Sequence, residues 1–466
     1  MSSRRDQLFS YQFMVQRVIS AFVYRDAELV QTPFRRAGGT LFIGAMIGVL
    51  ALAGVGVYGL LVQGGKQTWR SDQVLIMEKD TGARYVYLNG VLHPVVNYAS
   101  ARLILKKQQL GTVSVARASL KDAPRGAPLG ITGAPDSLPD QKRLIRSSWV
   151  LCSRPTTDEA GQAVTRSVLY IGGRSVGGQQ LGDQAVVAKL PDGSTFLVWR
   201  DHRYAIKQPQ IVLYAMALGQ APVVPVAPAW LNAIPQGVDV GPIDIAKRGS
   251  GSPLRGVAVG QVLVAQAEGG KSQYHVALDD GIADITQVQA SILLNDPATV
   301  TAYAGAQPAK IERSDLATAK RSARRLLPAT DATAPPATNP TAAGGVDRAG
   351  MCTTFGEAGA APSVTIGVTL PKASGTKTSG AGVDEIVVNP GGGVLVQATM
   401  STESTASAIS LVTDLGTRYA LASRDVVAYL GYGSKSMVKM PAQLVAMLPQ
   451  GPALDPEAAG IPVATG

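Results

Sequence analysis

A long uncharged segment near the start of the chain limits its folding options more than any other feature. No charged side chain lies between Arg36 and Lys66, and residues 40–62 read TLFIGAMIGVLALAGVGVYGLLV. A helix of this length spans a hydrocarbon layer of about 30 Å. The alternatives are a signal peptide and a buried core helix, but a secretory apolar region typically has about 7–15 residues and lies nearer the terminus. We therefore predict an uncleaved transmembrane helix over residues 40–62.

The charges that flank this helix predict its orientation. The first 36 residues carry six arginines, whereas only Lys66 and Arg70 closely follow the span. Because positive residues stay on the cytoplasmic side, we expect a single-pass protein of the inner (cell) membrane with a cytoplasmic N-terminus and an extracytoplasmic C-terminal part. The net charge of +10 is compatible with nucleic acid or anionic lipid, but the charge that precedes the span favours a lipid membrane and no nucleic acid.

Residues 1–39, on the predicted cytoplasmic side, are too apolar for a free tail. Apolar side chains recur at helical spacing between Leu8 and Val23, which predicts an amphipathic helix packed on a partner or on the membrane surface. Binding of the arginines to anionic lipid is the simpler interpretation, but docking on a partner is the one we favour. The candidate residues for docking on a partner are Phe9, Tyr11, Phe13 and Arg17.

A repeat organises the part of the chain that follows the span. The sequence RYAI begins at Arg203 and is followed by PAWLNAIPQG, while RYAL begins at Arg418 and is followed by PAQLVAMLPQG. Fainter copies begin at Arg84 and Gln273. Self-similarity of this kind indicates duplicated structural units. We predict four repeat units, at residues 63–130, 201–250, 251–328 and 409–456.

Segments between the repeat units alternate in the manner of strands. Examples are residues 149–152, 164–171 and 364–370, and Asp192-Gly193 is typical of a hairpin turn. We expect residues 131–200 and 350–408 to form one central β domain, with a flexible linker at 329–349 and a tail at 457–466. The predicted fold class is α+β and β-rich: one N-terminal transmembrane helix, then an elongated extracytoplasmic domain of four repeat units around a central β domain.

A basic segment of the third repeat unit is expected to be helical. Ser314 is a suitable N-cap, and Pro328 would end the helix. Cations are favoured in the last turn of a helix, where the chain carries Lys320, Arg321, Arg324 and Arg325. These charges indicate a solvated helix face, with a site for an envelope polymer or a partner as the alternative.

Cys152 and Cys352 are the only two cysteines in the sequence. Pairing is the default for two thiols in an oxidising exterior. A bridge between them would close a 200-residue loop, which is worth up to about 5 kcal/mol in the chain-entropy model. Two free buried thiols are the alternative.

The chain lacks the usual signatures of catalysis and metal binding. Its three histidines, His93, His202 and His275, lie far apart in the sequence, and no HExxH, CxxC or GxSxG motif occurs. Ligands for a metal ion and residues of a hydrolase triad need such spacings. We therefore predict no catalytic residues and no metal site.

One segment partly matches a nucleotide-binding motif. Residues 265–272 read AQAEGGKS, a relaxed phosphate loop in which Lys271 would reach phosphate and Ser272 would bind magnesium. Such a loop needs a helix directly after it, because the helix N-terminus supplies oriented amides and a favourable dipole. The repeat alignment predicts a strand there, so we interpret the segment as a hairpin turn. ATP bound at Lys271 and Ser272 is the alternative, and no other cofactor is expected.

The N-terminal stretch RDQLFSYQF at residues 5–13, followed by Arg17, Arg25-Asp26 and Pro33, resembles the start of EccB proteins of type VII (ESX) secretion systems. The likeness extends over essentially the whole chain. It implies a structural subunit of the inner-membrane core complex, assembled with EccC, EccD and EccE near the mycosin protease, whose exported domain forms a homo-oligomer. It also implies a structural disulfide between Cys152 and Cys352.

Two other functions stay open at this stage. Some EccB proteins are labelled ATPases, although the strand predicted after Lys271 argues against ATP hydrolysis here. Short β repeats with exposed aromatic residues often bind polymers, and Tyr204, Trp230 and Tyr419 are the candidates for a membrane-anchored module that binds the cell wall. An assembly subunit of a secretion machine is the leading hypothesis.

Overall fold

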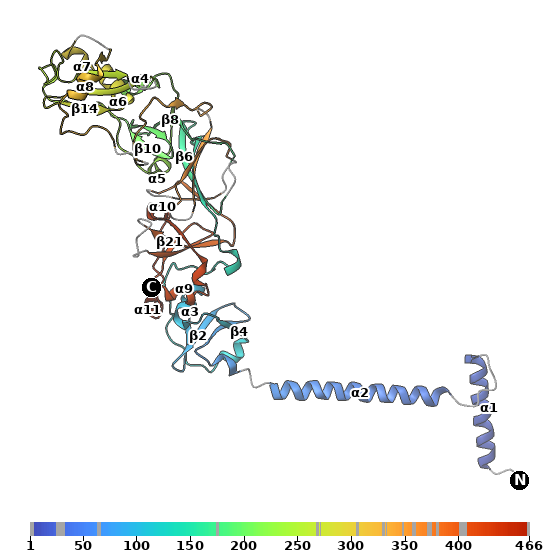
Figure 1. Ribbon diagram of the computed structural model, residues 1–466. Helices are drawn as coiled ribbons and strands as arrows, with labels where there is room; N and C mark the ends of the chain where they lie inside the picture. Colours follow the sequence, from blue (N-terminus) through green and yellow to red (C-terminus); the bar gives the residue numbers. More distant parts are fainter. Residues whose placement is uncertain are drawn as a thin grey trace. The chain divides into compact units, whose positions relative to one another are not determined.

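The computed structural model describes most of the chain and has a mixed α+β fold (Figure 1). One compact unit comprises Met1–Ser71, Ile76–Gly82 and Val113–Ala123, and the other comprises Asp72–Leu75, Ala83–Thr112 and Pro124–Gly466. The residues described are 4–24, 33–62, 67–173, 177–266, 270, 272–303, 307–328, 331, 333–346, 349–356, 360–370, 375–378, 382–399 and 408–463.

Two helices open the chain, α1 (Arg4–Tyr24) and α2 (Pro33–Val62). Within the described residues, α2 alone is long and apolar enough to cross a membrane, over the stretch Gly38–Tyr58. The predicted span at residues 40–62 therefore lies entirely within one helix, which begins seven residues earlier.

Of the five sheets in the described part of the chain, four share one strand order. In chain order their strands run first, second and third, then a helical segment, then a fourth strand beside the first. In three of these sheets the register shows the first strand antiparallel to the second and parallel to the fourth. The first sheet holds β1 (Val74–Glu78), β2 (Arg84–Leu88), β3 (Val91–Pro94) and β4 (Gly111–Val115), with helix α3 (Tyr98–Leu105) before β4.

The other three sheets of this order follow along the chain. The second has β8 (Gln184–Lys189), β9 (Thr195–Trp199), β10 (His202–Ala205), α4 (Pro209–Ala215) and β11 (Val223–Pro225). The third has β12 (Val262–Gln266), β13 (Ser272–Ala277), β14 (Ile282–Ile285), α6 (Gln287–Asn295), α7 (Pro297–Ala302) and β15 (Ala309–Lys310). The fourth has β21 (Gly393–Thr399), β22 (Ile409–Thr413), β23 (Arg418–Ala420), α9 (Asp425–Tyr429) and β24 (Met437–Pro441).

Local sequence explains many of these boundaries. Gly193 adopts a φ of +89° between β8 and β9, and Asp192 Oδ1 accepts a hydrogen bond from Ser194 N at 2.9 Å, so the Asp-Gly pair forms the turn that its residues favour. Helix α6 starts at a capping box in which the Thr286 and Gln289 side chains each accept a hydrogen bond from the other residue's backbone N–H.

The fifth sheet has seven strands, and its members come from two distant parts of the chain. Strands before residue 181 pair with strands after residue 349, as in the registers Cys152↔Cys352 and Val168↔Glu385. In sheet order the strands are β19 (Thr376–Lys377), β20 (Glu385–Val388), β6 (Ala163–Ile171), β5 (Trp149–Thr157), β17 (Gly350–Phe355), β18 (Ser363–Val368) and β7 (Gln179–Gln180).

Some strands pair differently from the sequence prediction. Residues 184–199 and 393–399, expected in the central β domain, pair instead with β10 and with β22 and β24, respectively. The physical reason is that the Arg-Tyr strands β10 and β23 need the preceding strands as hydrogen-bonded neighbours, so the second and fourth sheets begin before the repeated sequence motif does.

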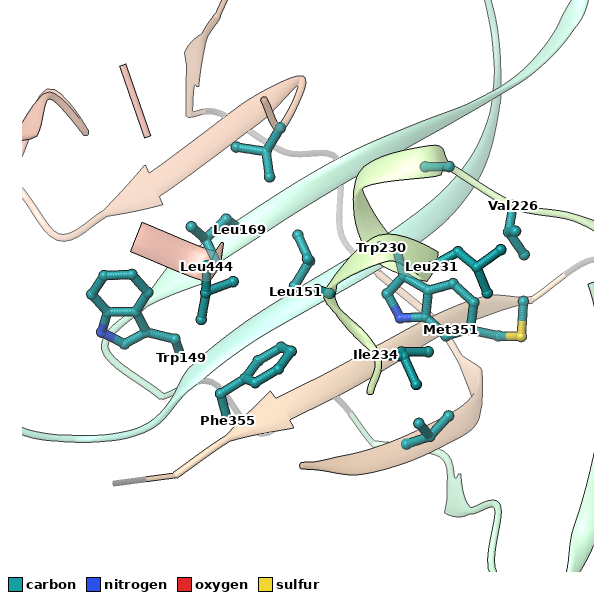
Figure 2. Packing of buried hydrophobic residues seen from close by; sticks show 14 of the residues in the cluster. Trp149, Leu151, Leu169, Val226, Trp230, Leu231, Ile234, Met351, Phe355 and Leu444 are labelled. Atoms are coloured by element: carbon teal, nitrogen blue, oxygen red, sulfur yellow. The ribbon is translucent and has the colours of Figure 1, made fainter. Parts of the chain in front are cut away.

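The largest buried cluster lies on one face of the seven-stranded sheet. Trp230 and Leu231 of helix α5 (Pro228–Ala233) lie in this cluster with Met351 of β17 and Leu151 of β5 (Figure 2). Helix α10 (Ala442–Ala446) adds Leu444 to the same cluster. The core is thus shared between the central sheet and helices that follow the second and fourth sheets.

Two segments predicted to be loosely attached are packed into the body. Within the expected linker, β16 (Thr341–Ala342) pairs with β8, and Ala343 and Val346 are buried in the largest cluster. Within the expected tail, Ala459 of α11 (Pro456–Ala459) is fully buried, and Val463 N donates to Pro128 O at 2.8 Å. Small apolar residues in these segments fill the core, which their low-complexity composition does not reveal.

The helix predicted from Ser314 to Pro328 is short. Helix α8 (Arg313–Thr318) has no side-chain cap, and Ser314 lies inside it. The chain after the helix is extended, because it forms backbone hydrogen bonds with Ile282 of β14. Ile282 N donates to Lys320 O at 2.8 Å, and Ser322 N donates to Ile282 O at 2.9 Å. The four cations expected in a last helical turn therefore lie outside the helix.

Candidate sites for membrane anchoring and assembly

Helix α2 exposes apolar side chains around its whole surface. Leu41, Phe42, Ile47 and Leu52 are all more than half exposed, and none of the stretch Gly38–Tyr58 is buried. A helix that is apolar on all sides and unpacked by protein is suited to a lipid environment.

Helix α1 also carries exposed aromatic side chains, including three of the predicted docking residues. Phe9 and Phe13 lie one turn apart and are 69% and 64% exposed, and Tyr11, two positions from each, is 69% exposed on the other side of the helix. The Arg17 guanidinium lies 5.9 Å from the centre of the Phe13 ring, within cation–π range. Because apolar groups occur on more than one side, one flat surface would leave some of them in water.

Cys152 and Cys352 form a disulfide. They face each other across the neighbouring strands β5 and β17 with 4.0 Å between their Cα atoms, and both are fully buried. Val150, Val168, Tyr170 and Val368 are buried around the bridge. The predicted pairing is confirmed, and the alternative of two free thiols is wrong.

A buried arginine links helices of the first and fourth sheets, and no sequence pattern predicted it. Arg102, on α3, is 7% exposed; its Nε donates to Tyr429 O at 2.8 Å and its Nη2 to Gln108 O at 3.0 Å. Tyr429 ends α9, so the cation meets free carbonyls at a helix C-terminus, where positive charge is favoured. The contact joins residues 327 positions apart, a separation that no local pattern reveals.

The segment with the relaxed phosphate-loop pattern joins two strands. Lys271 lies outside the described residues. Ser272 opens β13 opposite Gln266 of β12, in an antiparallel register that continues to Val276↔Val262. A strand, not a helix, therefore follows the motif, and its amides are used in sheet pairing.

One cavity with a mainly apolar lining offers no catalytic set among the residues around it. It has a volume of about 630 Å³ and lies among the ends of β5, β6, β8 and β11. Its only ionisable lining residue is Lys189, and Ser153 Oγ accepts a hydrogen bond from Ala227 N at 2.9 Å. A nucleophile with an adjacent base, which hydrolysis needs, is not found among the residues that line this cavity.

Each of the three histidines has a different hydrogen-bond partner. Nδ1 of His93 lies 3.0 Å from Ala127 O, that of His202 lies 2.9 Å from Arg200 O, and that of His275 lies 2.6 Å from Asp284 Oδ1. Across the described part of the chain, no group of three or more histidine, cysteine or acidic residues is placed to hold a metal ion.

The aromatic residues considered for polymer binding lie in the core. Tyr204 and Trp230 are fully buried and Tyr419 is 7% exposed. They were expected on the surface, but Tyr204 packs in the core of the second sheet, Tyr419 in that of the fourth, and Trp230 in the cluster on the seven-stranded sheet. This removes the observation on which the wall-binding alternative depended.

The structure has one helix suited to lipid, a second helix with exposed aromatic groups and a body of small mixed sheets that carries a disulfide. These features define the class of membrane-anchored proteins. The family model "Type VII secretion system ESX-1, transport TM domain B" matches residues 1–464. The chain therefore belongs to this family, the EccB membrane components of type VII secretion systems.

Relatives and solved structures agree with this assignment. The chain is 28% identical to the ESX-3 secretion system ATPase EccB3 of Mycolicibacterium smegmatis over 97% of its own length and 89% of that protein. For the protein of the same name from Mycobacterium tuberculosis H37Rv the identity is 26%, and the match spans 67% of this chain and 59% of that protein.

Two solved structures are similar to the structure of this chain. The EccB3 dimer from the ESX-3 core complex has 27% identity and a TM-score of 0.64, over 83% of this chain and 100% of that chain. A chain of the intact ESX-5 inner membrane complex has the same TM-score at 24% identity, over 100% of this chain and 96% of that one, and shows the shared fold.

Proposed function

We propose that this chain is a structural subunit of a type VII secretion inner-membrane complex and acts by assembly. The observation that carries the proposal is helix α1, whose exposed Phe9, Tyr11 and Phe13 need cover on more than one side. A membrane surface covers one side, and a partner subunit covers the other. EccC, EccD and EccE are the proposed partners, with the mycosin protease outside the membrane.

The proposed orientation places α1 in the cytoplasm and the sheets outside. The six arginines before the span support it through the positive-inside rule, and the disulfide supports it because such bonds persist in oxidising surroundings. A membrane-impermeant maleimide applied to intact cells should label a Ser250→Cys variant and leave a Gln12→Cys variant unlabelled. The reverse labelling would overturn the orientation.

We also propose that the four sheets of shared order are copies of one repeat unit. Besides the strand order, each makes a parallel bridge from its third-strand region to a later segment: Leu92↔Arg125, Arg203↔Gln236, Ile282↔Arg321 and Arg418↔Gln450. The seven-stranded sheet would be the central domain between them. A second copy of the chain is the proposed homo-oligomer partner, in line with the dimer formed by the similar EccB3 protein.

Curated relatives carry the name ATPase, but we propose that this chain does not hydrolyse ATP. The strand pairing of Ser272 supports this view, because no helix dipole follows the candidate loop. Purified full-length protein should release no more phosphate from ATP than a Lys271→Ala/Ser272→Ala variant. Hydrolysis by the wild type that this variant abolishes would contradict the proposal.

The assembly role is tested by changing one face of α1. Phe9→Glu/Phe13→Glu adds two charges to an exposed aromatic pair, and Gln12→Glu/Gln16→Glu adds the same charges at the same spacing on polar exposed positions. We expect both variants to insert in the membrane, but only the first to lose co-purifying core subunits. Equal recovery of the complex with both variants would refute docking through Phe9 and Phe13.

A further inference from the structure

A basic cleft lies at the edge of the third sheet. Its cavity has a volume of about 870 Å³, and it is lined by Ile282, Ala283 and Asp284 of β14 and by residues of the 321–328 segment. The arginines in that lining are Arg321, Arg324 and Arg325.

The backbone holds these arginines at the sheet. Ile282 N donates to Lys320 O at 2.8 Å and Ser322 N donates to Ile282 O at 2.9 Å, so residues 320–322 extend along β14. Gly281 permits this close approach: a Cβ atom there would lie 2.4 Å from Lys320 O, and its φ of +157° already favours glycine. The basic segment is thus fixed beside the strand and is not a free helical face.

The cleft has more positive than negative charge. Asp284 is its one acidic lining residue, and its Oδ1 already accepts hydrogen bonds from Arg321 Nη1 at 2.5 Å and His275 Nδ1 at 2.6 Å. Arg324 Nη1 donates to Asp244 O at 2.7 Å. The exposed Arg325 makes no hydrogen bond or ion pair with the described residues.

We propose that this cleft is a binding site for an oxyanion, a phosphate or carboxylate group, held by Arg324 and Arg325 and in part by Arg321. Guanidinium groups present forked N–H donors that match both groups in pairs. Among the described residues, Arg324 and Arg325 have no carboxylate partner, so their remaining donors are available to a ligand. Asp284 opposes the anion by its charge and competes for Arg321.

Removing arginine charge tests the site. Full-length protein in a non-ionic detergent is titrated calorimetrically with pyrophosphate and with citrate at constant ionic strength, which separates the phosphate and carboxylate sources. We expect Arg324→Gln/Arg325→Gln to weaken binding of the preferred anion by tenfold or more, the scale of one lost hydrogen bond to a charged group. Arg255→Gln removes an exposed arginine of the same part of the chain that does not line the cleft and should leave the affinity unchanged.

A gain-of-function variant excludes misfolding as the explanation. Asp284→Asn keeps an acceptor for His275 but removes the opposing charge and releases Arg321, so the same anion should bind more tightly than to the wild type. Weaker binding after loss of Arg324 and Arg325, together with tighter binding in Asp284→Asn, would support the site. No binding of either anion by the wild type, equal binding by the Arg324→Gln/Arg325→Gln and Arg255→Gln variants, or no gain in Asp284→Asn would overturn it.

Discussion

Gly237 is a position where one added methyl group should destabilise the fold. It ends the Pro-Gln-Gly motif after α5, and a Cβ atom there would lie 2.2 Å from Cε1 and 2.6 Å from Cδ1 of Tyr204 and 2.9 Å from Thr333 O. Carbon atoms pack best at about 3.5–4.0 Å, so the ring would have to retreat by about 1.3 Å. Tyr204 is fully buried, and its hydroxyl donates to Ala334 O at 2.9 Å.

The expected effect of Gly237→Ala follows from these contacts. Overpacking of a rigid ring costs about 1–3 kcal/mol, and a strained buried hydrogen bond costs about 1 kcal/mol more. Replacing glycine also lowers the entropy of the unfolded chain, which stabilises by about 0.4–1 kcal/mol. We therefore expect the free energy of unfolding to fall by about 1–3.5 kcal/mol.

The assay is urea unfolding of the full-length protein in detergent, followed by tryptophan fluorescence, since Trp230 is buried in the helix directly before the motif. Gly251→Ala is the matched control, because its Cβ atom would meet nothing within 4 Å. Gly451→Ala should behave like Gly237→Ala, since its Cβ atom would lie 2.3 Å from Cε1 of Tyr419. Equal midpoints for Gly237→Ala and Gly251→Ala would refute the packing argument.

Three other predictions concern stability. Cys152→Ala/Cys352→Ala opens the 200-residue loop and should lower the free energy of unfolding in denaturant by up to about 5 kcal/mol; an unchanged midpoint would contradict this. Arg102→Lys should cost about 1–2 kcal/mol, because an ammonium cannot replace the fork that reaches Tyr429 O, and the melting temperature should fall accordingly. Burial lowers the pKa of His275 below its usual 6.5 in the folded protein. As the pH falls below about 6.5, the histidine therefore takes up a proton more readily in the unfolded chain, and the free energy of unfolding should decline. A His275→Gln variant should lose that pH dependence.

Local and periodic features were predictable from the sequence. The transmembrane helix was predicted from a long run of uncharged, mainly apolar residues. The disulfide was predicted because the sequence has only two cysteines. The Tyr-Gly contact had a visible sequence signal as well: the Arg-Tyr and Pro-Gln-Gly segments recur together, because the ring of Tyr204 or Tyr419 packs where only a glycine fits.

Contacts made at long range were not predictable. Arg102 meets Tyr429 across 327 positions, and nothing near either residue marks the pair. Composition misled at residues 333–346, because alanine and proline are typical of linkers, yet Ala343 and Val346 fill the core. Lys320 and Arg321 looked like the end of a helix, but backbone bonding to Ile282 was stronger than helix propensity over so short a segment.

The seven-stranded sheet also dictates an order of events during synthesis. Its strands β5 and β6 emerge early, but their neighbours β17 and β20 follow only after about 200 further residues, which form the second and third sheets. Until then Cys152 has no partner, and with only two cysteines in the chain no wrong intramolecular bridge can form. The chain therefore needs an oxidant that acts late and no isomerase to correct its pairing, and a chain truncated before Gly350 would keep the outer edge of β5 open to other strands.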